Sequence, residues 1–491
     1  MNLDGLNKEQ RLAAETLEGP VLILAGAGSG KTRALTCRVA NLMAHGVAAY
    51  HILALTFTNK AAKEMKERIA ALVGDQANDA WISTFHSTCA KILRRDIEKL
   101  GGYTRSFVIY DDDDQGAVLK EILKRQNIDD KLLPIRELKA KISDAKNKLM
   151  SPDEWFDHSD RDFRCQQIHT VFVEYEARLK TLNALDFDDL LVKTLELLAD
   201  HPPVLDVYRK RFQYVMVDEY QDTNYIQEQI VFLLGAKHHN ICVVGDDDQG
   251  LYRFRGATIR NILEFPHKFE NEGCKIIPLV VNYRSNSDIV DFYNEWISTT
   301  SGHKFKFSWD RYRYQKKIEP HVKSDIQSPA VVKLFSKDDE DEWHEKILGF
   351  IKELKESGKL TDYNQLAFLF SSVKHQRVTA LANFLERNGI NVYSPRSDMF
   401  FKRDEIKLAL GCLMLMFPKY VMKLEKQEFD FLQVEHYRYY RECIVAANEY
   451  VTRADNKELL QFIRKHGKVH AGLTGTTDYA YSGLLYKLFM F

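Results

Sequence analysis

Short apolar runs alternate with helix-spaced segments through the first 290 residues of the chain. Residues 21–25 (VLILA) form a continuous apolar run, and after a glycine-rich loop the sequence TRALTCRVANLMAHG has helical spacing. Similar runs recur as HILALTF (51–57), YVMVDE (214–219), NICVVGD (240–246) and CKIIPLVV (274–281). Continuous apolar runs are typical of strands that are buried on both faces of a parallel sheet. The pattern therefore predicts an α/β domain with a mostly parallel sheet.

The pattern changes twice along the chain. Residues 101–179 are charged and helix-forming, which predicts a helical insertion with Pro134 opening a helix. A polar, aromatic and basic stretch at 301–329 predicts a linker, and the runs AVVKLF and QLAFLF beyond it predict the start of a second α/β domain. The chain then divides into a first α/β domain (1–100 and 180–290), the insertion (101–179), the partial second domain (291–419) and a helical segment that belongs to a second insertion (420–491).

Composition narrows the class of protein. The 69 Lys and Arg residues almost balance the 70 Asp and Glu residues, so any contact with nucleic acid must be local. The seven cysteines are scattered and never in C-x-x-C spacing, which argues against a zinc site or a disulfide framework. The polar start of the chain is unlike a signal peptide, and no apolar run is long enough to span a bilayer. We therefore expect a cytoplasmic protein without a membrane partner.

A phosphate-binding loop is the strongest single motif. The sequence AGAGSGKT (25–32) stands between a predicted strand and a predicted helix. Its glycines allow backbone N–H groups to face a phosphate, Lys31 supplies a positive charge, and the Thr32 hydroxyl can reach a magnesium ion. The candidate nucleotide-binding residues are Ala25, Gly26, Ala27, Gly28, Ser29, Gly30, Lys31, Thr32 and Arg33.

An acidic pair follows another predicted strand, in YVMVDEYQDT. We expect Asp218 to hold the magnesium ion, and Glu219 to orient or deprotonate the attacking water. Paired acids after a strand can also simply cap the next helix, but beside a phosphate-binding loop they indicate nucleotide hydrolysis.

Further motifs appear in a fixed order. They are LNKEQ, ALTFTNKAAKEM (54–65), STFHS (83–87), LDFDDLL (185–191), VVGDDDQGLYRFRGA (243–257) and LVVNYRS (279–285). Together with the loop and the acidic pair, they resemble the superfamily 1 DNA helicases of the UvrD, Rep and PcrA group. The resemblance implies a RecA-like P-loop fold and an ATP- and Mg²⁺-dependent motor. It also implies 3′–5′ movement on single-stranded DNA, or on a duplex with a single-stranded tail.

The resemblance also assigns roles to residues. It places Gln10 and Tyr283 at the adenine, and Gln249 and Arg284 at the γ-phosphate. Several aromatic residues lie in or beside polar, loop-like sequence, where they are available to stack on bases. The candidate DNA contacts are Phe57, Asn59, Thr84, Phe85, His86, Phe187, Tyr252, Phe254 and Arg255.

Two departures from the family pattern stand out. Gly250 replaces the usual Ser beside Gln249, and two later motifs, one with a second γ-phosphate arginine, are not found before Phe491. We therefore expect the chain to stop inside its second motor domain. An alternative is an ATP-binding module that binds single-stranded DNA but does not unwind it, and a small-molecule kinase ranks last. The basic, aromatic stretch 304–317 fits a DNA-backbone contact and a solvated linker equally well, whereas the Lys-rich helix at 136–148 is expected to be solvated.

Overall fold

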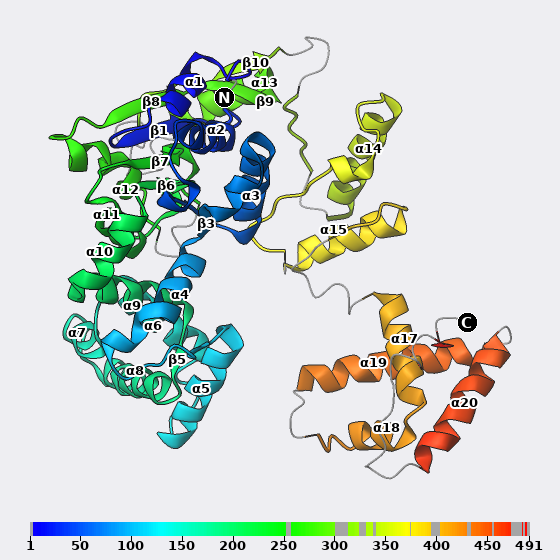
Figure 1. Ribbon diagram of the computed structural model, residues 1–491. Helices are drawn as coiled ribbons and strands as arrows, with labels where there is room; N and C mark the ends of the chain where they lie inside the picture. The colour runs from blue at the N-terminus through cyan, green and yellow to red at the C-terminus, as the bar shows by residue number, and fades with distance from the viewer. Residues whose placement is uncertain are drawn as a thin grey trace. The chain divides into compact units, whose positions relative to one another are not determined.

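The computed structural model describes residues 3–251, 257–299, 313–323, 330–336, 340–373, 375–393, 403–429, 434–453, 456–472, 484 and 487–488. The chain forms two compact units, Met1–Val332 (unit 1) and Lys333–Phe491 (unit 2) (Figure 1).

The centre of unit 1 is a parallel sheet with the strand order β3-β2-β6-β7-β1-β8. All five neighbouring pairs are parallel. The strands are β1 (Val21–Ala25), β2 (Ile52–Thr56), β3 (Trp81–Thr84), β6 (Tyr214–Val217), β7 (Ile241–Gly245) and β8 (Lys275–Leu279). The predicted parallel α/β domain is confirmed.

Alternate residues of each strand enter cores on opposite faces of this sheet. Leu22 and Leu24 join one cluster, while Val21 and Ile23 join the other. The first cluster is completed by α4 (Phe85–Asp96), α9 (Phe187–Asp200), α10 (Pro202–Arg211) and α11 (Tyr225–Gly235). The second is completed by α1 (Lys8–Glu15), α2 (Lys31–Ala44) and α3 (Asn59–Val73). Burial on both faces explains why the strands read as continuous apolar runs.

A helical subdomain interrupts the α/β domain between β3 and β6. Its helices share one apolar core, and they are α5 (Asp112–Arg125), α6 (Ile135–Asn147), α7 (Pro152–Asp157) and α8 (Phe163–Thr181). Short strands β4 (Val108–Ile109) and β5 (Ala184–Leu185) pair in parallel where the chain enters and leaves it. Pro134 is the N-cap of α6, as predicted.

The Lys-rich helix α6 is not a purely solvated face. Lys146 is buried, and its Nζ lies 2.8 Å from Asp186, 2.7 Å from Asp189 and 2.8 Å from Glu176. Asp186 is the N-cap of α9, so the ion pairs join the subdomain to the α/β domain. The expectation of a solvated helix was therefore wrong at Lys146.

After β8 the chain continues through β9 (Val281–Asn286), α13 (Ser287–Thr299) and β10 (Glu319–Val322), and β10 pairs in parallel with β9. The short α12 (Arg260–Glu264) precedes β8. Just before β10, the side chains of Arg313 and Lys316 are buried in ion pairs. For these two residues neither a DNA-backbone contact nor a solvated linker is correct, whereas their neighbours Gln315 and Lys317 are exposed. Residues 304–312 lie outside the described residues.

In unit 2 the regular elements of the described residues are helical. One apolar core holds α14 (Glu340–Glu356) and α15 (Gln376–Arg387). Another holds α17 (Asp404–Leu415), α19 (Val434–Val451) and α20 (Lys457–Ala471), with α18 (Pro418–Glu425) alongside. A Cβ on Gly411 would collide with the Cys443 carbonyl, so this glycine permits the close approach of α17 and α19.

The strand-like runs AVVKLF (330–335), which crosses the boundary between the units, and QLAFLF (365–370) form no strand among the described residues. Their side chains are largely exposed, with Leu369 at 94%. A strand needs a neighbour to satisfy its N–H and C=O groups, and the described residues supply none here. Among the helices that the structure describes, none is long and apolar enough to cross a membrane.

Candidate functional site

The carboxyl ends of the parallel strands bring most of the predicted nucleotide residues into one pocket. The phosphate-binding loop follows β1, Glu219 lies just after β6, and Gln249 lies just after β7. The pocket is lined by Ala27, Gly28, Ser29, Gly30, Lys31, Thr32, Arg33, Arg68, Glu219, Gln249 and Arg284. Ligands of open α/β sheets bind at this edge. Arg68, on α3, is a lining residue that the sequence did not single out.

The loop is shaped to present backbone N–H groups. Gly30 has a φ of +81°, and α2 begins at the next residue, so the helix N-terminus opens directly into the pocket. The Ser29 hydroxyl donates to the Gly26 carbonyl at 2.7 Å, which closes the loop on itself. A helix N-terminus behind such a loop favours an anion. Ala25 and Gly26 differ from the prediction, because both are buried and neither lines the pocket; Ala25 is the last residue of β1.

Several charged side chains lie close together in and beside this pocket. Lys31 Nζ lies 2.7 Å from Glu219 Oε2, and the Gln221 side-chain amide donates to the same oxygen at 2.8 Å. Asp218 is buried and accepts the backbone N–H of Glu219 at 3.0 Å. Burial and the neighbouring Glu219 charge raise the pKa of Asp218 to about 6, although Lys31 opposes this. A divalent cation beside Asp218 would compensate this buried charge, and a carboxylate with a threonine hydroxyl suits Mg²⁺.

Gln10 and Tyr283 approach the loop from one side. Gln10 is buried and its amide donates to the Ser29 carbonyl at 2.8 Å. Asn7 donates to the Tyr283 hydroxyl at 2.8 Å, and the Tyr283 backbone N–H donates to the Gly28 carbonyl at 3.0 Å. The two residues predicted at the adenine therefore contact the same loop.

Asn282 is a positioning residue that the sequence analysis missed. Its side-chain amide donates to the Ala27 carbonyl at 2.7 Å, and its Oδ1 accepts the backbone N–H groups of Arg284 and Ser285. It thereby fixes the turn that carries Arg284 against the loop. The only available signal was its place beside the Tyr-Arg pair after an apolar run.

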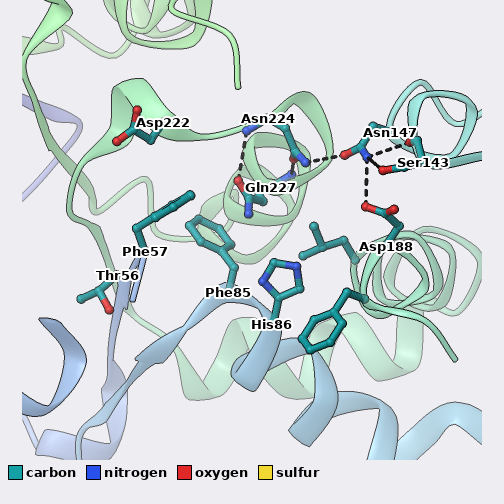
Figure 2. A pocket seen from close by; sticks show the side chains of 12 residues that line it. Thr56, Phe57, Phe85, His86, Ser143, Asn147, Asp188, Asp222, Asn224 and Gln227 are labelled. Carbon is teal, nitrogen blue, oxygen red and sulfur yellow. Dashed lines mark hydrogen bonds between the residues drawn. The ribbon is translucent and has the colours of Figure 1, made fainter. Parts of the chain in front are cut away.

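A second pocket lies where the α/β domain and the helical subdomain of unit 1 meet. Figure 2 shows the Phe57 and Phe85 rings close together, with Asn224 and Gln227 beyond them. Phe187 is 48% exposed, and its ring meets the His86 ring edge-on at 5.8 Å. The pocket is lined by Thr56, Phe57, Phe85, His86, Ser143, Asn147, Phe187, Asp188, Leu191, Asp222, Asn224 and Gln227. Four of the predicted DNA contacts thus gather in one place.

Phe85 and the predicted DNA contacts outside this pocket are placed differently from the other three. Phe85 is only 2% exposed and belongs to the core, so it forms the wall of the pocket rather than a free stacking surface. Thr84 is used as the N-cap of α4, where it accepts the Ser87 N–H, and Asn59 is the exposed first residue of α3. Neither lines the pocket. Tyr252, Phe254 and Arg255 lie outside the described residues.

A polar wall faces these aromatic rings. Asn224 donates to Asn147 Oδ1 at 2.8 Å, and Asn147 donates to Asp188 Oδ1 at 3.0 Å (Figure 2). Burial, followed by the Asp186 charge, raises the pKa of Asp188. The wall joins α6, α9 and the start of α11, which are distant in sequence. Asn147 ends a helix that was expected to be solvated, so this wall was not predicted from the sequence.

Comparison with known proteins agrees with this arrangement. Residues 6–270 match the UvrD/REP helicase N-terminal domain, and residues 277–428 match the UvrD-like helicase C-terminal domain. The chain is 41% identical over 415 residues to the ATP-dependent DNA helicase PcrA of Bacillus subtilis, covering 84% of this chain and 53% of the relative. It is 40% identical to the PcrA of Staphylococcus aureus, covering 84% and 54%. The chain thus spans about half the length of these curated relatives. On the strength of the N-terminal domain match, it belongs to the UvrD/REP helicase family.

Proposed function

We propose that the chain binds ATP with Mg²⁺ at the loop after β1 and hydrolyses it. The observation that carries the proposal is the convergence of Lys31, Glu219, Gln249 and Arg284 on one pocket. Loop N–H groups and Lys31 hold the phosphates, and Thr32 and Asp218 hold the Mg²⁺, which offsets charge on the transferred phosphoryl group. Gln249 and Arg284 contact the γ-phosphate, with Arg33 at the loop and Gln10 and Tyr283 at the adenine.

The Lys31–Glu219 ion pair suggests how nucleotide binding prepares hydrolysis. A phosphate takes Lys31 away from Glu219, which leaves the carboxylate available as the general base for water. Glu219 keeps its hydrogen bond from Gln221, so its position is maintained while its charge is released. Binding thereby turns a neutralised carboxylate into a base.

We also propose that single-stranded DNA, including the tail of a duplex, occupies the second pocket. The exposed Phe187 ring and the partly buried Phe57 ring stack on bases, at about 1–3 kcal/mol per base. His86 and the polar wall meet the sugar, the phosphate or base edges. Movement in the 3′–5′ direction is the polarity that the family implies. Asn59, Thr84, Tyr252, Phe254 and Arg255 remain predicted contacts.

A second function is favoured by one observation. The strand-like runs of unit 2 have no strand partners among the described residues, and a complete second motor domain is needed to convert hydrolysis into unwinding. An ATP-binding module that holds single-stranded DNA without unwinding it is therefore the alternative.

ATP hydrolysis by the full chain, with and without a single-stranded oligonucleotide, separates these proposals. DNA-stimulated hydrolysis supports the motor, and unwinding of a 3′-tailed but not a 5′-tailed duplex supports its polarity. DNA binding without stimulation supports the module. Lys31→Ala should abolish hydrolysis while circular dichroism stays unchanged, because the loop loses its positive charge. A retained rate would remove Lys31 from the phosphate site.

A further inference from the structure

Three consecutive carboxylates follow β7 in the interior of unit 1. The side chains of Asp246, Asp247 and Asp248 are fully buried, and their oxygens lie within 4.8 Å of one another. So much negative charge in one buried place requires compensation. The compensation comes from the segment before β10, about 70 residues further along the chain.

Lys316 provides most of this compensation. Its side chain is 1% exposed, and its Nζ lies 2.9 Å from Asp246, 3.0 Å from Asp248 and in contact with Asp247. Arg313 binds Asp248 through two hydrogen bonds, at 2.8 and 2.6 Å. Burial alone would lower the pKa of Lys316, but the three carboxylates raise it, so the lysine stays charged.

Asp246 connects Lys316 to the nucleotide pocket. Its Oδ2 accepts a hydrogen bond from the Gln249 side-chain amide at 2.6 Å, while its Oδ1 faces Lys316. Its backbone N–H donates to Gln221 Oε1 at 3.0 Å, and Gln221 in turn donates to Glu219. Asp246 therefore links Lys316 to the proposed γ-phosphate contact through its carboxylate, and its backbone N–H leads through Gln221 to the proposed base.

We propose that Lys316 is a positioning residue for ATP hydrolysis, which holds Asp246 in the orientation that aims Gln249 at the nucleotide. This inference rests on the proposed function of the nucleotide pocket. Through Lys316, the segment that precedes unit 2 in sequence helps to set the geometry of that pocket without lining it.

The expected consequence of losing Lys316 follows from the charges. Without the lysine, the three buried carboxylates lose the cation that they share, so they repel one another or take up protons. Asp246 then turns away, and Gln249 loses its side-chain partner. A reacting group misplaced by about 1 Å costs about 100-fold in rate. The loop, Lys31 and Tyr283 are untouched, so the loss belongs to kcat rather than to KM.

The test compares Lys316→Met with Lys316→Arg and with Lys317→Met, because Lys317 is the exposed neighbour of the same type. We expect kcat for ATP to fall at least about 10-fold in Lys316→Met, with KM within about 2-fold. Lys316→Arg should recover part of kcat, and Lys317→Met should behave as wild type. Hydrogen exchange gives a second readout. The Asp248 amide donates to the Asp246 carboxylate and the Gln249 amide to the Asp246 backbone carbonyl, so both should exchange faster when Lys316→Met loosens the Asp246–Gln249 turn.

A double variant covers the possibility that Lys316→Met does not fold. Lys316→Met with Asp247→Asn keeps the net charge of the cluster but removes the contact to Asp246, so kcat should remain low. Wild-type kcat in the folded single or double variant would overturn the proposal, as would unchanged exchange at Asp248 and Gln249. If the wild-type chain hydrolyses no ATP, the proposed function fails. Hydrogen exchange at Asp248 and Gln249 in Lys316→Met still decides whether Lys316 positions the turn from Asp246 to Gln249.

Discussion

Asp218 is buried at the end of β6 at a cost to folding, and Asp218→Asn should therefore stabilise the protein. Its pKa of about 6, against an ordinary 3.8, means that the folded state binds the proton more tightly than the unfolded state. Stability is therefore lost as pH rises from about 4 to about 6, and the full penalty persists above that range. This pKa difference lowers the free energy of unfolding by about 3 kcal/mol at pH 8 and by about half of that at pH 5. Asparagine retains an Oδ1 acceptor for the Glu219 N–H.

Urea unfolding at pH 5 and pH 8, with a chelator present, measures this effect. We expect Asp218→Asn to raise the free energy of unfolding at pH 8 by up to about 3 kcal/mol, and clearly less at pH 5. Asp186→Asn is the matched control of opposite sign. Although burial opposes it, Lys146 lowers the pKa of Asp186, so this carboxylate contributes stability above about pH 4. Equal or absent stabilisation by Asp218→Asn at the two pH values would refute the reasoning.

Two further substitutions test the helical subdomain and the pocket proposed for single-stranded DNA. Lys146→Met should lower the free energy of unfolding by about 3–5 kcal/mol, because it leaves buried carboxylates without their cation. Lys148→Met, at an exposed position, should change the free energy of unfolding by less than about 0.5 kcal/mol in the same urea titration. Phe187→Ala should weaken binding of a fluorescent single-stranded oligonucleotide by about 10-fold without changing ATP affinity. Phe163→Ala, which removes a more exposed ring outside the pocket, should leave both affinities unchanged, and equal losses in the two variants would exclude specific stacking.

The sequence predicted the sheet, and it placed most of the proposed nucleotide-binding residues where the structure brings them together, because both features are encoded locally. Each strand is one apolar run, and each proposed catalytic residue stands in the loop or turn that follows such a run. In a parallel sheet the carboxyl ends meet at one edge, so Lys31, Glu219 and Gln249 converge without further information. The role of Asn282 was not predicted, because it binds a backbone carbonyl, and no residue pattern in the sequence indicates such a contact.

The pocket proposed for DNA was harder to predict, because local polarity is a poor guide to burial. Phe85 stands between polar residues, yet it is the first residue of α4 and its ring enters the core. Phe187 has a similar context and is the first residue of α9, but its ring is half exposed. The difference is set by which face of each helix meets the sheet, and this depends on packing rather than on neighbours in sequence.

Charge was the least predictable property. Lys146 and Lys316 both lie in basic stretches that suggested a solvated or DNA-facing surface, yet each is buried among three carboxylates. Asp186 and Asp189 lie 40 and 43 residues from Lys146, far beyond the spacing at which charge patterns along a helix are informative. Such a lysine cannot also neutralise DNA phosphates. In this chain, part of the near-balance of charge is therefore internal to the fold, and a basic run in the sequence overstates the positive surface that is left for DNA.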